Sequence, residues 1–176
     1  MAAGRARAGV GGLTMMKEMS TYFTAEKQES LLFVAVGLAA IGVAAWLWMN
    51  GHRLKSMAFP LIAIALIQIV VGGSVYLRTD AQLEGLTAQY QSAPAEFKEA
   101  ETSRMTVVMG NFKIYKSIEM ALLVVGIGLI AFLQRFDMAT GIGAGLVLQS
   151  AFMLALDMFA EARGMDYLRA LNAQVG

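Results

Sequence analysis

The sequence predicts an all-α integral membrane protein: a four-helix bundle that crosses the bilayer four times and carries an extramembrane helical hairpin between its second and third spans. Of the 176 residues, 57% are hydrophobic and only 15% are charged, whereas a soluble domain usually has about a quarter charged residues. The apolar residues also gather in long uncharged blocks. A bilayer requires such blocks, and a globular core does not.

Three uncharged blocks are long enough to cross a bilayer by themselves: residues 31–50, 57–77 and 138–156. At about 1.5 Å per residue, a helix of about 20 residues spans the roughly 30 Å hydrocarbon core. Trp46 lies near the end of the first block, where amphipathic aromatic rings favour the headgroup region. We expect the fourth span to continue past its uncharged block and to cover residues 138–160.

The third span is incomplete by length alone. Residues 120–134 are uncharged, but they give only about 22 Å of helix, which is too short to cross. The helix must therefore include upstream residues, and we expect the span to cover residues 113–134. This extension places Glu119 at or inside the membrane boundary, whereas Lys113 is long enough to reach the headgroups.

The segment between the second and third spans, residues 78–112, predicts a helical hairpin. Apolar residues recur at helical spacing on both sides of a turn at Pro94, and they are Leu83, Leu86, Tyr90, Phe97, Met105, Val108, Phe112 and Tyr115. Gly110 is a candidate helix break at the membrane surface. The stripe from Phe97 to Tyr115 is a candidate surface for a partner protein.

The chain divides into a polar N-terminal segment, residues 1–30, and a single transmembrane domain, residues 31–176. Four spans place both termini and the hairpin on one side. Arg53, Lys55 and Arg135 lie in the short loops, and the other 11 of the 14 Lys and Arg lie on the hairpin side. This count favours a cytoplasmic hairpin, whereas the charge density of the short loops favours the reverse. We expect a bacterial inner-membrane protein with its termini and hairpin in the cytoplasm.

Composition excludes several kinds of chemistry. The chain has no Cys and a single His, His52, so thiolate metal sites and bis-His haem ligation are excluded. A net charge of +1 gives no electrostatic reason to bind nucleic acid. Gly141, Gly143 and Gly145 lie in a hydrophobic block without a preceding strand, which excludes nucleotide binding. Thioethers suit Cu(I), but packing explains the 13 methionines more simply. We expect no catalytic residue, cofactor or metal.

Charged side chains at the ends of the third and fourth spans form the candidate functional site. Glu119 lies early in the third span and Asp157 lies late in the fourth, so both should sit at similar depth on the hairpin side. Neighbouring charges complete the set, and they are Lys116, Arg78, Glu161 and Arg163. One interpretation is a proton or cation site or a lipid-headgroup pocket. We favour a collar of salt bridges that fixes the helix ends, because charge is cheaper there than at the midplane.

Polar and small residues also occur deeper in the spans. Gln68 and Gln149 fall near the midplane, where a side-chain amide needs a partner. A hydrogen bond between them is the simplest inference, and a substrate site lined by both is the alternative. Gly143 and Ser150 are seven residues apart, and Gly126 follows Glu119 at the same interval. We expect these small residues to form helix-packing surfaces.

These observations favour a non-catalytic structural, accessory or self-assembling subunit of a membrane complex. Its partners would be the lipid bilayer and other membrane proteins or further copies of the same chain. The alternative is a small transporter or an ion or proton channel that uses Glu119 and Asp157. A third hypothesis is a lipid-acting membrane enzyme with these carboxyl groups as acid and base.

Overall fold

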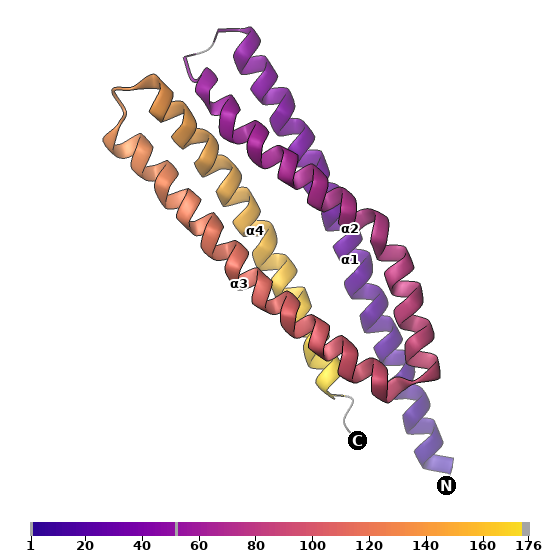
Figure 1. Ribbon diagram of the computed structural model, residues 1–176. Coiled ribbons are helices and arrows are strands. Elements are labelled where there is room, and N and C mark those ends of the chain that lie inside the picture. The colour runs from indigo at the N-terminus through magenta and orange to yellow at the C-terminus, as the bar shows by residue number, and fades with distance from the viewer. Residues whose placement is uncertain (1, 52, 174–176) are drawn as a thin grey trace.

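The structure is built from four long helices and one short 3₁₀ helix. The computed structural model describes residues 2–51 and 53–173, with side chains from residue 12 onward. In chain order the elements are α1 (Ala2–Met49), η1 (Lys55–Met57), α2 (Ala58–Ser92), α3 (Pro94–Phe132) and α4 (Asp137–Ala173) (Figure 1). His52 lies outside the described residues.

The four long helices are each able to cross a bilayer. An apolar stretch of sufficient length occurs within Gly12–Met49, Lys55–Ser92, Pro94–Phe132 and Asp137–Ala173. By length and composition, therefore, the prediction of an all-α chain with four candidate membrane helices is confirmed.

The helices extend beyond the predicted spans without interruption. Residues 78–92 continue α2 and residues 94–112 begin α3, so the segment between the second and third spans consists of the ends of these two helices. The break expected at Gly110 is absent, and that prediction was wrong. A single glycine costs a helix only about 1 kcal/mol, which the packing of its neighbours offsets. Likewise, α1 is continuous through residue 30.

The turns between the helices follow from local sequence. A single residue, Ala93, separates α2 from α3, with φ −144° and ψ 69°. The residue before a proline is driven out of the helical region, and Pro94 then suits the first turn of α3. After α1, Gly51 has a φ of 59°, a left-handed conformation that favours glycine.

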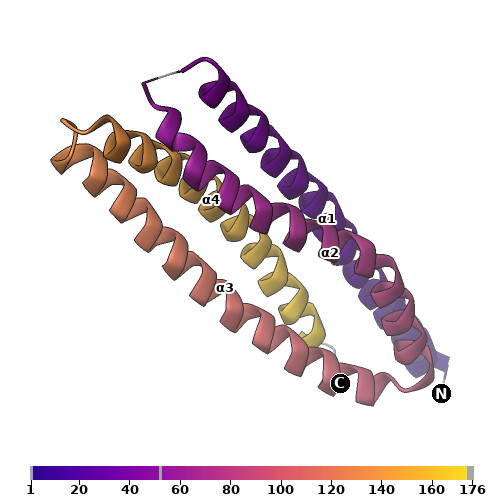
Figure 2. The ribbon, with the colours of Figure 1, turned by 45° about the horizontal axis from the view of Figure 1, so that its top comes forward.

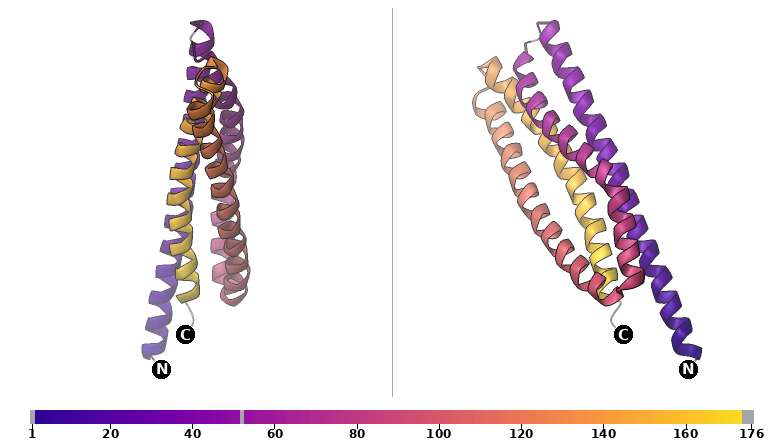
Figure 3. Two further views of the ribbon diagram at one scale, coloured as in Figure 1. Left: turned by 90° about the vertical axis from the view of Figure 1, so that its left-hand side faces the viewer. Right: turned by 45° about the vertical axis from the view of Figure 1, so that its right-hand side comes forward.

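The four helices are arranged differently at the two ends of the molecule. Near the short loops they lie in the order α3, α4, α2, α1 across the molecule (Figures 1 and 2). Near the α2–α3 turn, α1 and α4 lie on one side and α2 and α3 on the other, as the left view of Figure 3 shows. We call the first part the open layer and define it as residues 31–50, 57–77, 113–134 and 138–159.

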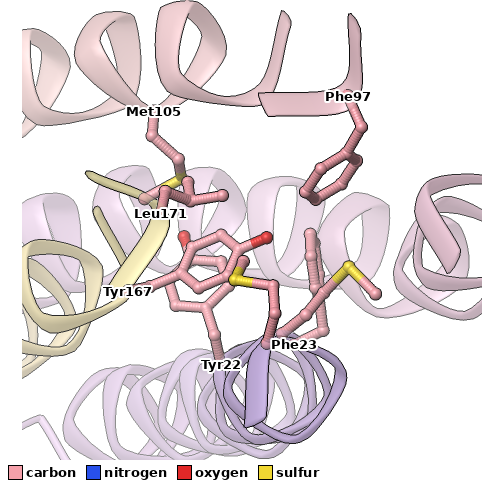
Figure 4. Close-up of a cluster of buried hydrophobic side chains, with 8 residues drawn as sticks. Tyr22, Phe23, Phe97, Met105, Tyr167 and Leu171 are labelled. Carbon is pink, nitrogen blue, oxygen red and sulfur yellow. The ribbon is translucent and has the colours of Figure 1, made fainter. Parts of the chain in front are cut away.

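The second part, which we call the closed bundle, comprises residues 12–30, 78–92, 94–112 and 160–173. Four helices surround one core there, made of the buried side chains Met15, Met19, Tyr22, Phe23, Phe97, Met105, Tyr167 and Leu171 (Figure 4). The rings of Tyr22 and Tyr167 are stacked, with centroids 4.7 Å apart. The bundle therefore closes outside the predicted spans, and the spans themselves form the layer.

The apolar stripe at the start of α3 faces this core. Phe97 and Met105 are fully buried, and Val108 packs against the same cluster. Tyr115, by contrast, is exposed. The stripe therefore packs inside the molecule over most of its length, and the expectation that it offers a surface to a partner was wrong for Phe97 and Met105.

Small residues dominate the contacts in the open layer. Between α1 and α2 the buried set includes Ala40, Ala44, Ala58 and Ala65. Between α3 and α4, a Cβ atom built on Gly143 would lie 2.7 Å from the carbonyl oxygen of Gly126. Close backbone packing through small residues is typical of helices that associate within a bilayer.

Substituting Gly143 by alanine tests the α3–α4 packing. The added methyl group must displace the backbone of α3, and overpacking of this kind typically costs about 1–3 kcal/mol. We expect Gly143→Ala to lower the unfolding temperature of the protein in mild detergent, measured by circular dichroism. Gly128→Ala is the control, because nothing lies within 4 Å of a Cβ atom there. Equal stability of the two variants would contradict the close contact.

Candidate functional site

Glu119 of α3 and Asp157 of α4 meet in the seam between these helices. Glu119 is only 3% exposed, and its carboxyl group lies near that of Asp157. Side chains on a helix lean toward its N-terminus. Because α3 and α4 are antiparallel, the two carboxyl groups lean toward each other. The structure therefore brings together the two carboxyl groups that the sequence placed at similar depth.

Lys116 pairs with a different carboxylate. Its Nζ donates a hydrogen bond to Glu161 of α4, about one turn closer to the closed bundle. Both side chains are partly buried, so this pair is less screened than a surface pair. Lys116 thus forms its ion pair with Glu161, and its charge also lies near the carboxyl groups of Glu119 and Asp157.

The two predicted arginines bind acidic residues of α1. Arg163 of α4 pairs with Glu29, and Arg78 of α2 lies 3.9 Å from Glu26. Sequence reasoning missed Glu26 and Glu29, because it treated residues 1–30 as a separate polar segment. Glu26 and Glu29 lie just before the first uncharged block, and this position was the sequence feature that could have identified them as part of the site. The six predicted charges therefore form two groups, one in the α3–α4 seam and one against α1.

Gln68 of α2 and Gln149 of α4 form a buried amide pair in the open layer. The Nε2 of Gln68 donates to the Oε1 of Gln149 at 3.3 Å, and both side chains are almost fully buried. The remaining amide atoms, Oε1 of Gln68 and Nε2 of Gln149, are buried without a hydrogen-bond partner among the described residues. The pair joins α2 to α4 at the centre of the layer, where a free amide would be costly.

Glu101 is the centre of a second polar network, in the closed bundle. It is fully buried and accepts two hydrogen bonds of 2.7 Å from the guanidinium of Arg104. The hydroxyl of Tyr167 on α4 donates a third, at 3.1 Å. The guanidinium also lies over the ring of Phe23 on α1, 5.6 Å from its centroid. Glu101 therefore ties α3 to α4 directly and to α1 through Arg104.

Sequence reasoning missed the Glu101 network. A glutamate three residues before an arginine on a helix usually forms an ordinary exposed ion pair. Only the packing of Tyr167 and Phe23 from other helices removes Glu101 from water. At the opposite end of the molecule, Arg53 and Asp137 form an exposed pair at 2.6 Å that joins the loop after α1 to the first residue of α4.

The polar side chains of the candidate site are suited to proton transfer and hydrogen bonding. Among the residues that the structure describes, no group of three or more His, Cys, Asp or Glu could hold a metal ion. Carboxyl groups, amides and hydroxyls such as those of the open layer can hold protons or polar molecules. No family model, curated protein or solved structure matches the chain. Function is therefore inferred from the geometry of the chain itself.

Removing the Glu101 carboxylate tests its structural role. In Glu101→Ala, Arg104 and the Tyr167 hydroxyl lose their partner, and breaking a buried pair costs about 3–5 kcal/mol. We expect about 2–3 kcal/mol here, because Arg104 keeps some contact with water. Asp166→Ala, which breaks the exposed Arg169–Asp166 pair, should change the free energy of unfolding by less than about 1 kcal/mol. Chemical unfolding in mild detergent would measure both, and equal effects would contradict the assignment.

Proposed function

We propose that the protein is a non-catalytic subunit of a membrane assembly, with a structural or accessory role. The observation that supports this is the continuity of all four helices from the open layer into the closed bundle. Ion pairs join them where the two parts meet: Lys27 to Asp80 between α1 and α2, Glu29 to Arg163 between α1 and α4, and Lys116 to Glu161 between α3 and α4. Most of these charges hold helices together, which suits a rigid frame.

In this proposal the open layer lies in the bilayer and the closed bundle stands on one side of it. Large apolar side chains point outward from the layer, including Leu66 of α2 and Val124 of α3. Lipid tails would cover them at no cost. The excess of basic residues on the bundle side favours the cytoplasmic face of a cell membrane, as the charge count suggests.

The surface of the closed bundle is the proposed contact region for a partner. Its large apolar side chains are mostly used in the core, but Leu13 of α1 and Val107 of α3 remain 72% and 62% exposed. Another membrane subunit or a second copy of the chain would cover these side chains. Single exposed apolar residues are common on proteins, so contact must be tested directly.

Site-specific photo-crosslinking in the native membrane tests this proposal. A photoreactive amino acid at Val107 or Leu13 should give a discrete product, because the proposed partner covers these positions. A product of twice the chain mass indicates self-assembly, and a product of another mass indicates an accessory role. The control position is Glu84, which is exposed on α2. The absence of a product, or equal products at Glu84, would argue against the proposed assembly.

The second candidate function is a small transporter or an ion or proton channel. It is favoured by the proximity of Glu119 and Asp157 in the open layer, since carboxyl groups inside a membrane often mark ion or proton pathways. A hollow of about 430 Å³ opens on the outer face of α3, lined by Lys113, Ile114, Ser117, Ile118 and Ala121. Neither Glu119 nor Asp157 lines this hollow, so the transport function has less support than the structural one.

Flux measurements in proteoliposomes address the transport candidate. If the carboxyl pair couples transport, Glu119→Gln and Asp157→Asn should each abolish proton or cation flux, because neither variant can exchange a proton at that position. Asp137→Asn is the control, since Asp137 lies at the other end of the molecule in an exposed pair. Flux that persists in both variants would rule out this role.

A further inference from the structure

We propose that the outer face of α3 binds an anionic phospholipid where the open layer meets the closed bundle. The lipid phosphate pairs with Lys113, and an acyl chain lies along the helix beyond it. This inference rests on the proposed placement of the open layer in the bilayer, and it requires no protein partner.

The binding surface is the hollow of about 430 Å³ on α3, which we call the α3 hollow. It is lined by Lys113, Ile114, Ser117, Ile118 and Ala121, and all five side chains are exposed. In the open layer α3 lies at one edge, next to α4 (Figure 1). The α3 hollow therefore faces whatever surrounds the layer, which in a bilayer is lipid.

Lys113 differs from the other basic residues at this junction because it has no ion pair with a described residue. Each of the others is paired with a carboxylate of a neighbouring helix, and they are Lys27, Arg78, Lys116 and Arg163. The nearest carboxyl group along α3, that of Glu119, is buried and does not line the α3 hollow. An exposed cation at the edge of the hydrocarbon region attracts an anionic headgroup, and a lipid phosphate is available at that depth.

The order of side chains along α3 matches the order of groups in a phospholipid. The side chain of Lys113 leans toward the N-terminus of α3, and so toward the closed bundle and the headgroup region. Ile114, Ile118 and Ala121 follow at helical spacing in the opposite direction, into the open layer. The α3 hollow therefore offers a cation at its outer end and an apolar strip for a chain beyond it.

The residues just before Lys113 leave room for the headgroup. Gly110 lies one turn before Ile114 on the same face, and a Cβ atom built there would meet nothing within 4 Å. Asn111 is exposed on that face as well, and its amide can donate hydrogen bonds to phosphate or glycerol oxygens. Gly110 does not break the helix, but it keeps the surface beside Lys113 open.

The single basic side chain favours an anionic lipid over a zwitterionic one. In phosphatidylcholine the quaternary ammonium group neutralises the phosphate and would lie near Lys113 as a like charge. Phosphatidylglycerol has the same phosphodiester without that cation. One basic residue at an anionic surface contributes about 1 kcal/mol, which corresponds to a preference of about fivefold for the anionic lipid.

Quenching of tryptophan fluorescence by brominated lipids tests this preference at the site itself. The two natural tryptophans, Trp46 and Trp48, are first replaced by phenylalanine, and Val125→Trp then places a single reporter on α3. Val125 is exposed and lies one turn beyond Ala121 on the same face, outside the α3 hollow. In phosphatidylcholine vesicles, brominated phosphatidylglycerol should quench this reporter as strongly as about five times as much brominated phosphatidylcholine.

Leu66→Trp on α2 is the matched control position. Leu66 is exposed and lies twelve residues before Arg78, as Val125 lies twelve residues after Lys113, so both reporters sit at a similar depth. Arg78 already pairs with Glu26. The two brominated lipids should therefore quench the Leu66 reporter equally.

Removing the charge supplies the decisive comparison. With the Val125 reporter, Lys113→Gln should abolish the preference, whereas Lys17→Gln should preserve it, because Lys17 is exposed on α1 within the closed bundle. Both changes are at exposed positions, and circular dichroism would verify that the helices are retained. Equal quenching by the two lipids at Val125, or a preference that survives Lys113→Gln, would overturn the lipid site. Absence of quenching at both reporters would instead contradict the placement of the open layer in the bilayer, and the lipid site with it.

Discussion

The close approach of α3 and α4 at Gly126 and Gly143 is the constraint on which the α3–α4 seam depends. With no side chain on either residue, the carbonyl of one helix packs against the backbone of the other. This contact sets the register between the two antiparallel helices. The register then determines that Glu119 reaches Asp157 and that Lys116 reaches Glu161. A larger residue at either glycine would move all of these pairs.

Different interactions stabilise the closed bundle and the open layer. In the closed bundle, burial of rings and thioethers such as Phe23, Phe97 and Met105 removes apolar surface from water, which is the main driving force for folding. In the open layer, the helices meet through close contacts between small residues, a kind of packing that suits helices surrounded by lipid. This difference explains why four helices surround a core at one end and lie in a row at the other.

The boundary between the halves concentrates the ionic interactions. Glu29, Arg163, Lys116 and Glu161 lie where the apolar blocks end, and each ion pair joins two helices. Such pairs are individually modest when exposed, but partial burial strengthens them. They make the layer and the bundle one continuous frame. Glu119 and Asp157 differ from them, because neither forms an ion pair within 4 Å with a described residue, although both lie near Lys116.

The sequence by itself determined the four apolar helices and the small-residue faces that include Gly126 and Gly143. These features follow from the length of uncharged blocks and from helical spacing, which are local properties. The Gln68–Gln149 contact was also a sequence inference, because two amides at one depth in a membrane have few other partners.

Only the tertiary structure decided which helices became neighbours. Helical periodicity shows that a residue faces inward but not which helix it meets, so Arg163 could not be assigned to Glu29 or Arg78 to Glu26 beforehand. The burial of Glu101 was equally hidden, because it depends on Tyr167 and on neighbours from other helices. For the same reason, the burial of Glu119 could not be read from its own helix, because it depends on how α4 packs against α3.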